Sequence, residues 1–157
     1  WLNEAQFNRV KAFVDDAVAR GARVLTGGGR LTGPGYDGGW FLEPTVLDAI
    51  TPAMRLTCEE VFGPVLPLIP FENEAEVIAA ANDTEYGLAA YVLTRDLATA
   101  VRVGEALDYG IVGINDPVPT IPHAPFGGWK ASGMGREGGT EGLQAYLETK
   151  FLSVGIA

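Results

Sequence analysis

The chain has 157 residues, of which 47% are hydrophobic and 20% charged, as in an ordinary globular protein with one core. Eleven basic residues against 20 acidic ones give a formal net charge of −9, which repels phosphate backbones and anionic membranes, so neither nucleic acid nor a membrane is an expected partner. The single cysteine and single histidine exclude an internal disulfide and the usual zinc ligand sets, and they favour a reducing, cytoplasmic location.

The first part of the chain predicts one helix and two short strands. Apolar residues recur at three- and four-residue steps over 3–20, which indicates an amphipathic helix with Asn3 as its N-cap. ARVLT (22–26) predicts a buried strand. A glycine-rich loop at 27–39 separates it from a second predicted strand, WFLEPTVL (40–47).

The middle of the chain alternates strands with helices. Strands are predicted over 65–71, 88–94 and 110–115, and helices over 75–82 and 96–107. Because this alternation joins parallel strands through helical crossovers, we expect an α/β fold with a parallel-rich sheet.

The last part of the chain is a long loop rich in glycine and proline, at 116–139. A short helix (140–148) and a last strand (149–156) are predicted after it. The loop starts at the carboxyl end of a predicted parallel strand, where ligands of open sheets bind. Long loops with aromatic residues are usually functional rather than disordered, so we expect this loop to line a site.

Two glycine-rich motifs in this loop resemble nucleotide-binding patterns without meeting their context. GMGREG (133–138) fits G-x-G-x-x-G, but it does not join a strand to a helix inside a βαβ unit. GGWKASG (127–133) fails the phosphate-loop pattern because Lys130 does not follow the second glycine. The lone His123, flanked by prolines, is interpreted as a surface or pocket-wall residue rather than a catalyst.

The only cysteine, Cys58, stands directly before Glu59 and Glu60. A reactive thiolate requires positive surroundings, and two adjacent carboxylates oppose its ionisation. We therefore expect Cys58 to be a small packing residue and not a nucleophile.

Five blocks resemble the aldehyde dehydrogenase superfamily in order and spacing. They are EEVFGPV (59–65), NDTEYGLAAYVLTRD (82–96), GIVGIN (110–115), APFGGWKASGMGREGG (124–139) and EGLQAYLETK (141–150). Within the family, the second and third blocks look most like succinate-semialdehyde dehydrogenases. The resemblance implies NAD- or NADP-dependent oxidation of an aldehyde to an acid, through a cysteine thiohemiacetal and a thioester that a glutamate-activated water hydrolyses.

The resemblance also implies roles for residues of this chain. Glu60 corresponds to the acid that binds the nicotinamide ribose hydroxyls, for which an ionised carboxylate is a suitable acceptor. Phe62 resembles the aromatic residue that braces the nicotinamide. Phe126 resembles a wall of the aldehyde pocket, and Thr120 occupies a substrate-facing position where related semialdehyde enzymes tend to carry serine.

Arg136 and Glu148 resemble an ion pair near the family's subunit interface, although they could be two solvated charges. By the same resemblance, residues 1–138 are part of a catalytic domain, and 139–157 are its closing helix and an oligomerisation strand of a homo-oligomer. The cofactor-binding domain, the nucleophilic cysteine and the general-base glutamate would precede residue 1, so we expect the isolated chain to be inactive.

Several alternatives remain open from the sequence. The chain could be a short, non-catalytic binding or assembly module, although Trp1 in place of an initiator methionine favours part of a longer enzyme. The aldehyde could be succinate semialdehyde, glutarate semialdehyde or another small aldehyde. The choice between NAD and NADP depends on positions outside these residues.

Overall fold

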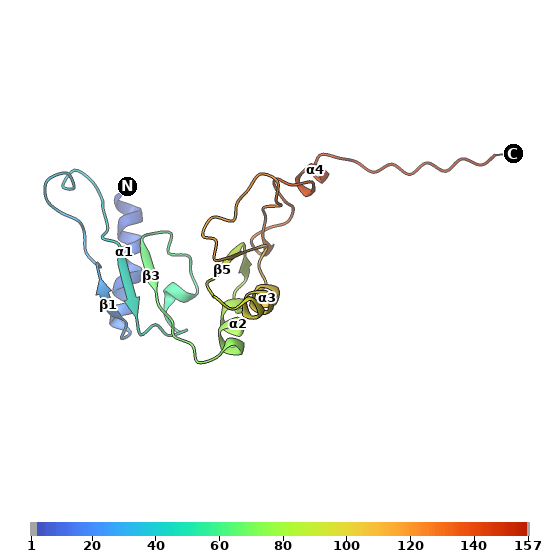
Figure 1. Cartoon of the computed structure of the whole chain (residues 1–157). Coiled ribbons are helices and arrows are strands. Elements are labelled where there is room, and N and C mark those ends of the chain that lie inside the picture. The colour runs from blue at the N-terminus through green and yellow to red at the C-terminus, as the bar shows by residue number, and fades with distance from the viewer. Residues whose placement is uncertain (1–2, 157) are drawn as a thin grey trace. The chain divides into compact units, whose positions relative to one another are not determined.

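A computed structural model describes residues 3–156, so Trp1 lies outside the described part of the chain. The chain divides into two compact units, Trp1–Pro70 and Phe71–Ala157 (Figure 1). Each unit has its own helices and strands. The boundary predicted between residues 138 and 139 separates part of a catalytic domain from the closing helix and oligomerisation strand. The division into two compact units does not test it, so it stays a prediction.

The first unit begins with helix α1, Glu4–Ala19, which confirms the predicted helix. The Asn3 side-chain oxygen accepts a hydrogen bond from the Gln6 backbone N–H at 2.9 Å, so Asn3 is the N-cap. Gly21 follows the helix with φ of 102°, a left-handed conformation that favours glycine.

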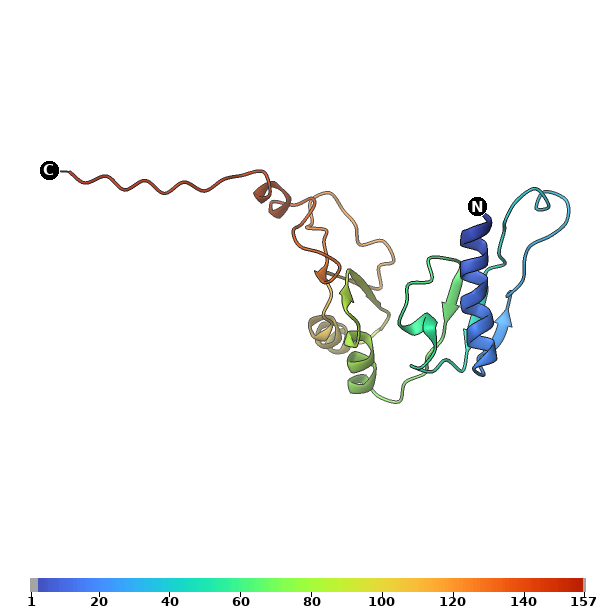
Figure 2. The same ribbon diagram turned by 180° about the vertical axis from the view of Figure 1, so that it is seen from behind.

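Three short strands of the first unit form one sheet in the order β1-β2-β3. Strands β1 (Arg23–Thr26) and β2 (Thr45–Asp48) are antiparallel, whereas β2 and β3 (Val65–Pro67) are parallel. Helix α1 lies along one face of this sheet (Figure 1 and Figure 2). The buried side chains that share this core are Phe13, Val14, Ala17, Ala22, Leu47, Ile50, Met54 and Leu56.

The strand predictions for this unit hold only in part. All four residues of β1 are exposed, so the expectation of a buried strand at 22–26 is wrong. Strand β2 begins after Pro44, which has no N–H to donate to a sheet. Strand β3 covers only the first three residues of the strand predicted over 65–71.

The second unit contains one complete βαβ crossover. Strand β5 (Ala89–Val92) pairs in parallel with β6 (Ile111–Ile114), and α3 (Leu97–Ala106) joins them. Asp96 caps α3 by accepting from the Thr99 N–H at 2.7 Å, as its sequence predicts. The remaining elements are α2 (Glu74–Asn82), β4 (Tyr86–Gly87), β7 (Trp129–Lys130) and α4 (Glu141–Gln144).

Residues 3–156 thus form a mixed α/β structure with three small sheets rather than one parallel-rich sheet. Pairs β1/β2 and β4/β7 are antiparallel, and only β5-α3-β6 shows the expected helical crossover. Helix α4 covers four residues, fewer than the predicted helix over 140–148.

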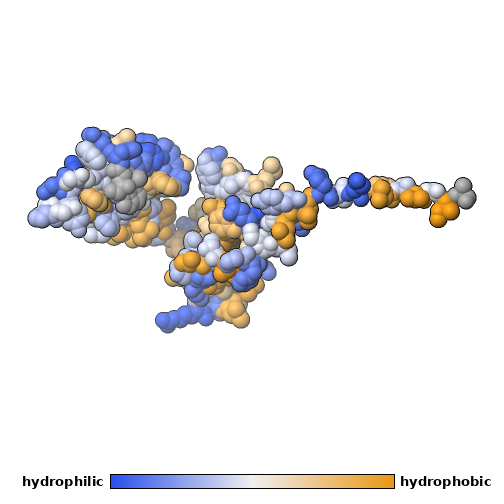
Figure 3. Space-filling model, turned by 90° about the horizontal axis from the view of Figure 1, so that it is seen from above, coloured by the Kyte–Doolittle hydropathy of each residue, from blue (hydrophilic) through white to orange (hydrophobic). Residues whose placement is uncertain are grey.

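The strand predicted over 149–156 is not formed, because this segment has no neighbouring strand to pair with in the described chain. Its apolar side chains are exposed instead, as Figure 3 shows on the extended C-terminal segment. They are Phe151, Leu152, Val154 and Ile156. No helix within residues 3–156 combines the length and apolar character needed to cross a bilayer.

Candidate functional site

Residues 60–62 form the middle of a loop that connects the short 3-10 helix η1 (Arg55–Thr57) to β3. Helix α1 holds this loop through three consecutive carbonyl groups. The Arg9 guanidinium donates to the Glu60 carbonyl oxygen at 2.7 Å and to the Val61 carbonyl oxygen at 2.9 Å. The Gln6 side-chain amide donates to the Phe62 carbonyl oxygen at 3.1 Å. The backbone of 60–62 is therefore fixed by two side chains from one helix.

The adjacent carboxylates Glu59 and Glu60 have different environments. Glu59 accepts two hydrogen bonds from the Arg55 guanidinium, at 2.9 and 3.1 Å. These hydrogen bonds hold the pKa of the Glu59 carboxyl below its ordinary value, and the positive charge of Arg55 contributes less to the same lowering. In residues 3–156 no hydrogen bond or ion pair engages the exposed Glu60 carboxylate, so it is available to accept from a ligand.

The two arginines beside these glutamates stack on one aromatic ring. The guanidinium carbon of Arg9 lies 5.0 Å from the centre of the Phe13 ring, and that of Arg55 lies 4.6 Å from it. Phe13 is only 1% exposed, so its ring is a rigid support for both cations. One arginine binds the Glu59 side chain, and the other binds the Glu60 backbone.

Phe62 has a left-handed backbone, with φ of 50°, and its side chain is 68% exposed. This conformation costs a residue other than glycine about 1–3 kcal/mol and persists only where neighbouring contacts hold it. The hydrogen bond from Gln6 is such a contact. It leaves the aromatic ring at the surface, where a planar ligand can pack against it.

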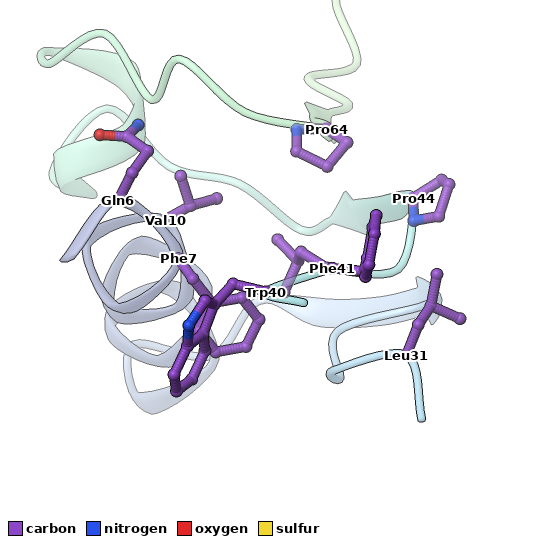
Figure 4. Close-up of a pocket in the computed structure, with 9 residues that line it drawn as sticks. Gln6, Phe7, Val10, Leu31, Trp40, Phe41, Pro44 and Pro64 are labelled. Atoms are coloured by element: carbon purple, nitrogen blue, oxygen red, sulfur yellow. The ribbon is translucent and has the colours of Figure 1, made fainter. Parts of the chain in front are cut away.

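An apolar pocket of about 230 Å³ lies beside this loop (Figure 4). Gln6 and Val10 of α1 and Pro64 of the loop contribute to it, and Phe7 packs against Trp40 with ring centres 5.5 Å apart. The Gln6 amide and the Trp40 indole N–H are the polar side-chain groups among its lining residues, so the pocket offers little to a charged ligand. The remaining lining residues are Leu31, Phe41, Leu42 and Pro44.

Cys58 is exposed, so the expectation that it is a packing residue is wrong. It follows η1 at the surface, where its sulfur lies 3.6 Å from the Thr57 hydroxyl oxygen and 3.8 Å from the Pro52 carbonyl oxygen. Neither neighbour is a cation or a base that could activate a thiol. The interpretation that Cys58 is not the nucleophile stays a prediction, which this geometry supports.

In the second unit, Thr120 and Phe126 line the same hollow, of about 160 Å³. The loop that carries them starts after β6, at the strand's carboxyl end, as expected for a binding loop. Phe126 is held by two backbone hydrogen bonds with Glu137, each 2.7 Å long. The other lining residues are Gly110, Ile111, Val112, Pro119, Ile121, Ala124 and Pro125.

Arg136 stabilises the same loop from within. Its guanidinium donates to the Gly128 carbonyl at 3.1 Å and to the Gly135 carbonyl at 2.6 Å. Glu148 is exposed beyond α4, and no ion pair joins it to Arg136 in the described part of the chain. An interface role for these two residues stays a prediction.

The rejected glycine-rich motifs have structural roles, and GGWKASG contains strand β7. The Lys130 ammonium donates to the Asn82 carbonyl at 2.9 Å and the Thr84 carbonyl at 3.2 Å, and lies 3.5 Å from the Asp108 carboxylate. The Lys130 ammonium therefore already has partners within the protein and is not presented to a phosphate. In GMGREG, three glycines have φ between 68° and 111°, as turns require. His123 is exposed, and no group of three potential metal ligands occurs in residues 3–156.

Sequence reasoning missed the residues that support the loop, namely Gln6, Arg9 and Arg55. Arg55 and Glu59 are four positions apart, a spacing that brings side chains together on a helical turn. That signal was available from the sequence. Nothing local connects Arg9 to Glu60, which lie 51 positions apart.

A family model described as "Aldehyde dehydrogenase family" matches residues 1–152. The chain is 48% identical over 155 residues to succinate-semialdehyde dehydrogenase [NADP(+)] GabD of Escherichia coli K12, covering 99% of this chain and 31% of that protein. It is 47% identical over 148 residues to glutarate-semialdehyde dehydrogenase of Pseudomonas putida KT2440, covering 94% of this chain and 30% of that protein.

The fold is likewise similar to solved structures. Betaine aldehyde dehydrogenase of Staphylococcus aureus in complex with NAD+ superposes with a TM-score of 0.89 at 44% identity, over 94% of this chain and 29% of that chain. The 157 residues thus span about three-tenths of the length of these relatives.

Proposed function

Because the chain belongs to the aldehyde dehydrogenase family, we propose that it is part of an NAD(P)-dependent enzyme that oxidises an aldehyde to a carboxylic acid. The relatives are named for NADP(+) or contain NAD+, which supports a nicotinamide cofactor. The cofactor, when bound, accepts a hydride from the substrate.

The observation that carries this proposal is the difference between Glu59 and Glu60. Arg55 engages the Glu59 carboxylate, whereas the Glu60 carboxylate is exposed and has no partner in the described chain. An ionised carboxylate accepts hydrogen bonds from two vicinal hydroxyls, which suits the ribose next to the nicotinamide. The exposed Phe62 ring, two residues further on, would brace the nicotinamide.

We assign no catalytic group to this chain. The family's nucleophilic cysteine and general-base glutamate have no counterpart in the 157 residues, and Cys58 has no activating neighbour. The chain on its own should therefore form no NAD(P)H from an aldehyde. Such a product from pure chain would contradict the assignment.

For the substrate, we propose a short aldehyde with a carboxylate at its far end, with succinate semialdehyde first and glutarate semialdehyde as the alternative. The hollow shared by Thr120 and Phe126 supports this choice. The Thr120 hydroxyl can donate to a carboxylate, and the Phe126 ring supplies an apolar wall that excludes water from a thioester. Relatives named for both semialdehydes cover the segment.

For the assembly, we propose a homo-oligomer in which residues 149–156 pair with another subunit. The exposed apolar side chains of this segment support pairing. The cytoplasmic location expected from the composition remains a prediction.

The test uses the complete enzyme that contains this chain and compares Glu60→Gln with its neighbour Glu59→Gln. The Glu60→Gln variant should raise the KM for NAD(P)+ about tenfold, since it weakens hydrogen bonds to the ribose. The Glu59→Gln variant loses only the contact to Arg55 and should keep the cofactor KM. Equal cofactor KM values in the two variants would overturn the assignment of Glu60.

A further inference from the structure

We propose that Lys130 of β7 is a positioning residue for aldehyde binding, which acts by holding the turn at 127–132 and, through it, the Phe126 ring. The inference rests on the proposed function, because it takes the hollow shared by Thr120 and Phe126 as the aldehyde pocket. Lys130 is not among the residues that line this hollow. It acts on the substrate only through the wall that it holds in place.

The Lys130 ammonium is anchored at the end of α2. It donates to the carbonyl oxygen of Asn82, the last residue of α2, at 2.9 Å and to that of Thr84 at 3.2 Å. A carboxylate oxygen of Asp108 lies 3.5 Å away. A cation is favourable at a helix C-terminus, where carbonyl groups lack partners within the helix. The Lys130 side chain is only 28% exposed, so these contacts fix its position.

The backbone at Lys130 has an unusual conformation. Its φ of 52° lies in the left-handed region, which is unfavourable for a residue other than glycine and persists only where contacts maintain it. The strand pairing around it is short, because β4 and β7 consist of two residues each, with Lys130 opposite Tyr86. The contacts of the side chain with the end of α2 therefore help to keep the turn in this conformation.

The segment that anchors Lys130 also holds one side of the aldehyde hollow. The Gly87 carbonyl accepts a hydrogen bond of 3.0 Å from the N–H of Gly110, which lines the hollow. A Cβ built on Gly110 would stand 1.9 Å from the Gly127 carbonyl oxygen, so the turn packs directly against this side. Phe126 immediately precedes that turn. A displacement of the turn therefore moves the Phe126 wall relative to Gly110.

The experiment uses the complete enzyme and the variant Lys130→Met, which keeps an unbranched side chain and removes the cation. The KM for succinate semialdehyde should rise about tenfold, since a small displacement of a wall weakens binding. The Kd for NAD(P)+ should stay unchanged, which also shows that the variant is folded. Lys130→Arg keeps the cation and should recover most of the affinity. An unchanged aldehyde KM in Lys130→Met would overturn the inference.

Lys130→Gly separates the side chain from the backbone. Glycine adopts the left-handed conformation readily but cannot reach the end of α2. If the ammonium holds the turn, the aldehyde KM of Lys130→Gly should be as high as that of Lys130→Met. A KM like that of the parent enzyme would show that the backbone conformation is sufficient and would overturn the inference.

Arg102→Met is the matched control. Arg102 also ties α2 to another part of the chain, because its guanidinium on α3 donates to the Glu74 carboxylate at 2.6 Å. Within residues 3–156 no hydrogen bond or ion pair joins Arg102 to the turn at 127–132. This variant should keep the aldehyde KM of the parent. An equal rise of KM in Arg102→Met and Lys130→Met would show a general loosening of α2 and overturn the inference.

The double variant Lys130→Met with Phe126→Ala separates this inference from the proposed function. If Lys130 acts through Phe126, the double variant should have about the aldehyde KM of Phe126→Ala alone. Multiplying effects would show that Lys130 acts independently and would overturn the inference. A normal KM for Lys130→Met with a raised KM for Phe126→Ala would overturn the inference alone. A normal KM for Phe126→Ala would overturn both it and the assignment of Phe126 to the pocket.

Discussion

Gly63 lies so close to Val10 of α1 that a Cβ built on the glycine would stand 2.7 and 2.8 Å from the two methyl carbons of the valine. Val10 is only 2% exposed, and a β-branched side chain in a helix has one strongly preferred rotamer. The valine therefore cannot move aside, and the loop that carries Glu60 owes its close approach to α1 to this glycine.

The first prediction concerns Gly63→Ala. The added methyl group should lower the free energy of unfolding by about 1–3 kcal/mol, as overpacking does, and should raise the cofactor Kd by displacing the loop. Denaturant unfolding and cofactor titration measure both quantities. Gly38→Ala is the control, because nothing lies within 4 Å of its built Cβ. An unchanged stability in Gly63→Ala would contradict the packing.

The second prediction concerns the exposed cysteine. Cys58→Ser should leave kcat and both KM values of the complete enzyme unchanged, because the hydrogen-bond partners of the sulfur within residues 3–156 are a hydroxyl and a carbonyl. A thiol reagent should reach Cys58, since the residue is exposed, and should modify it at the rate of an unactivated thiol. Loss of the chemical step in Cys58→Ser, seen in single-turnover kinetics, would be incompatible with the structure.

The third prediction concerns the Thr120 hydroxyl, which we propose binds the substrate carboxylate. Thr120→Val keeps the shape of threonine and removes its donor, so the KM for succinate semialdehyde should rise about tenfold. Thr120→Ser keeps the hydroxyl and should keep this KM. An aldehyde without a carboxylate should be oxidised equally well by all three proteins. Unchanged semialdehyde kinetics in Thr120→Val would remove Thr120 from the substrate pocket.

The fourth prediction concerns Arg136, whose guanidinium binds the Gly128 and Gly135 carbonyls. Arg136→Met should loosen the loop that holds Phe126 and raise the KM for the aldehyde, with the cofactor Kd unchanged. Arg95→Met, at an exposed arginine, is the control.

Glu148→Gln tests the hypothesis that Arg136 and Glu148 form an ion pair between subunits. If they do, both Arg136→Met and Glu148→Gln should shift subunit association in sedimentation experiments.

The fifth prediction concerns pH. Arg23 and Asp48 lie opposite each other on β1 and β2, and their side chains form hydrogen bonds of 2.9 and 2.5 Å. These hydrogen bonds hold the pKa of the Asp48 carboxyl below its ordinary value, and the positive charge of Arg23 contributes less to the same lowering. Stability from this pair is therefore present at neutral pH and is lost as the pH falls through the lowered pKa.

Arg23→Gln should return the pKa of Asp48 toward its ordinary value, which carbon-detected NMR titration measures directly. The stability difference between this variant and the parent should disappear at acid pH, and salt should reduce it at neutral pH because the pair is exposed. A difference that persists in strong acid would mean that the pair is not its cause.

Much of the secondary structure was predictable because it depends on neighbouring residues. Asn3 and Asp96 cap α1 and α3 as their positions indicate, and the βαβ crossover from β5 to β6 follows from the alternating pattern. The final strand was not predictable in this way. A strand needs a partner, and no pattern within 149–156 reveals that the described chain supplies none.

The site shows the same limit. The sequence by itself determined that Cys58 stands beside two carboxylates, and its motif blocks pointed to Glu60 and to the family. Only the tertiary structure decided how the backbone that carries Glu60 is held, because Arg9 reaches the Glu60 carbonyl from 51 positions away. Such contacts form when a helix packs on a loop, and packing depends on the shape of the whole unit rather than on local spacing.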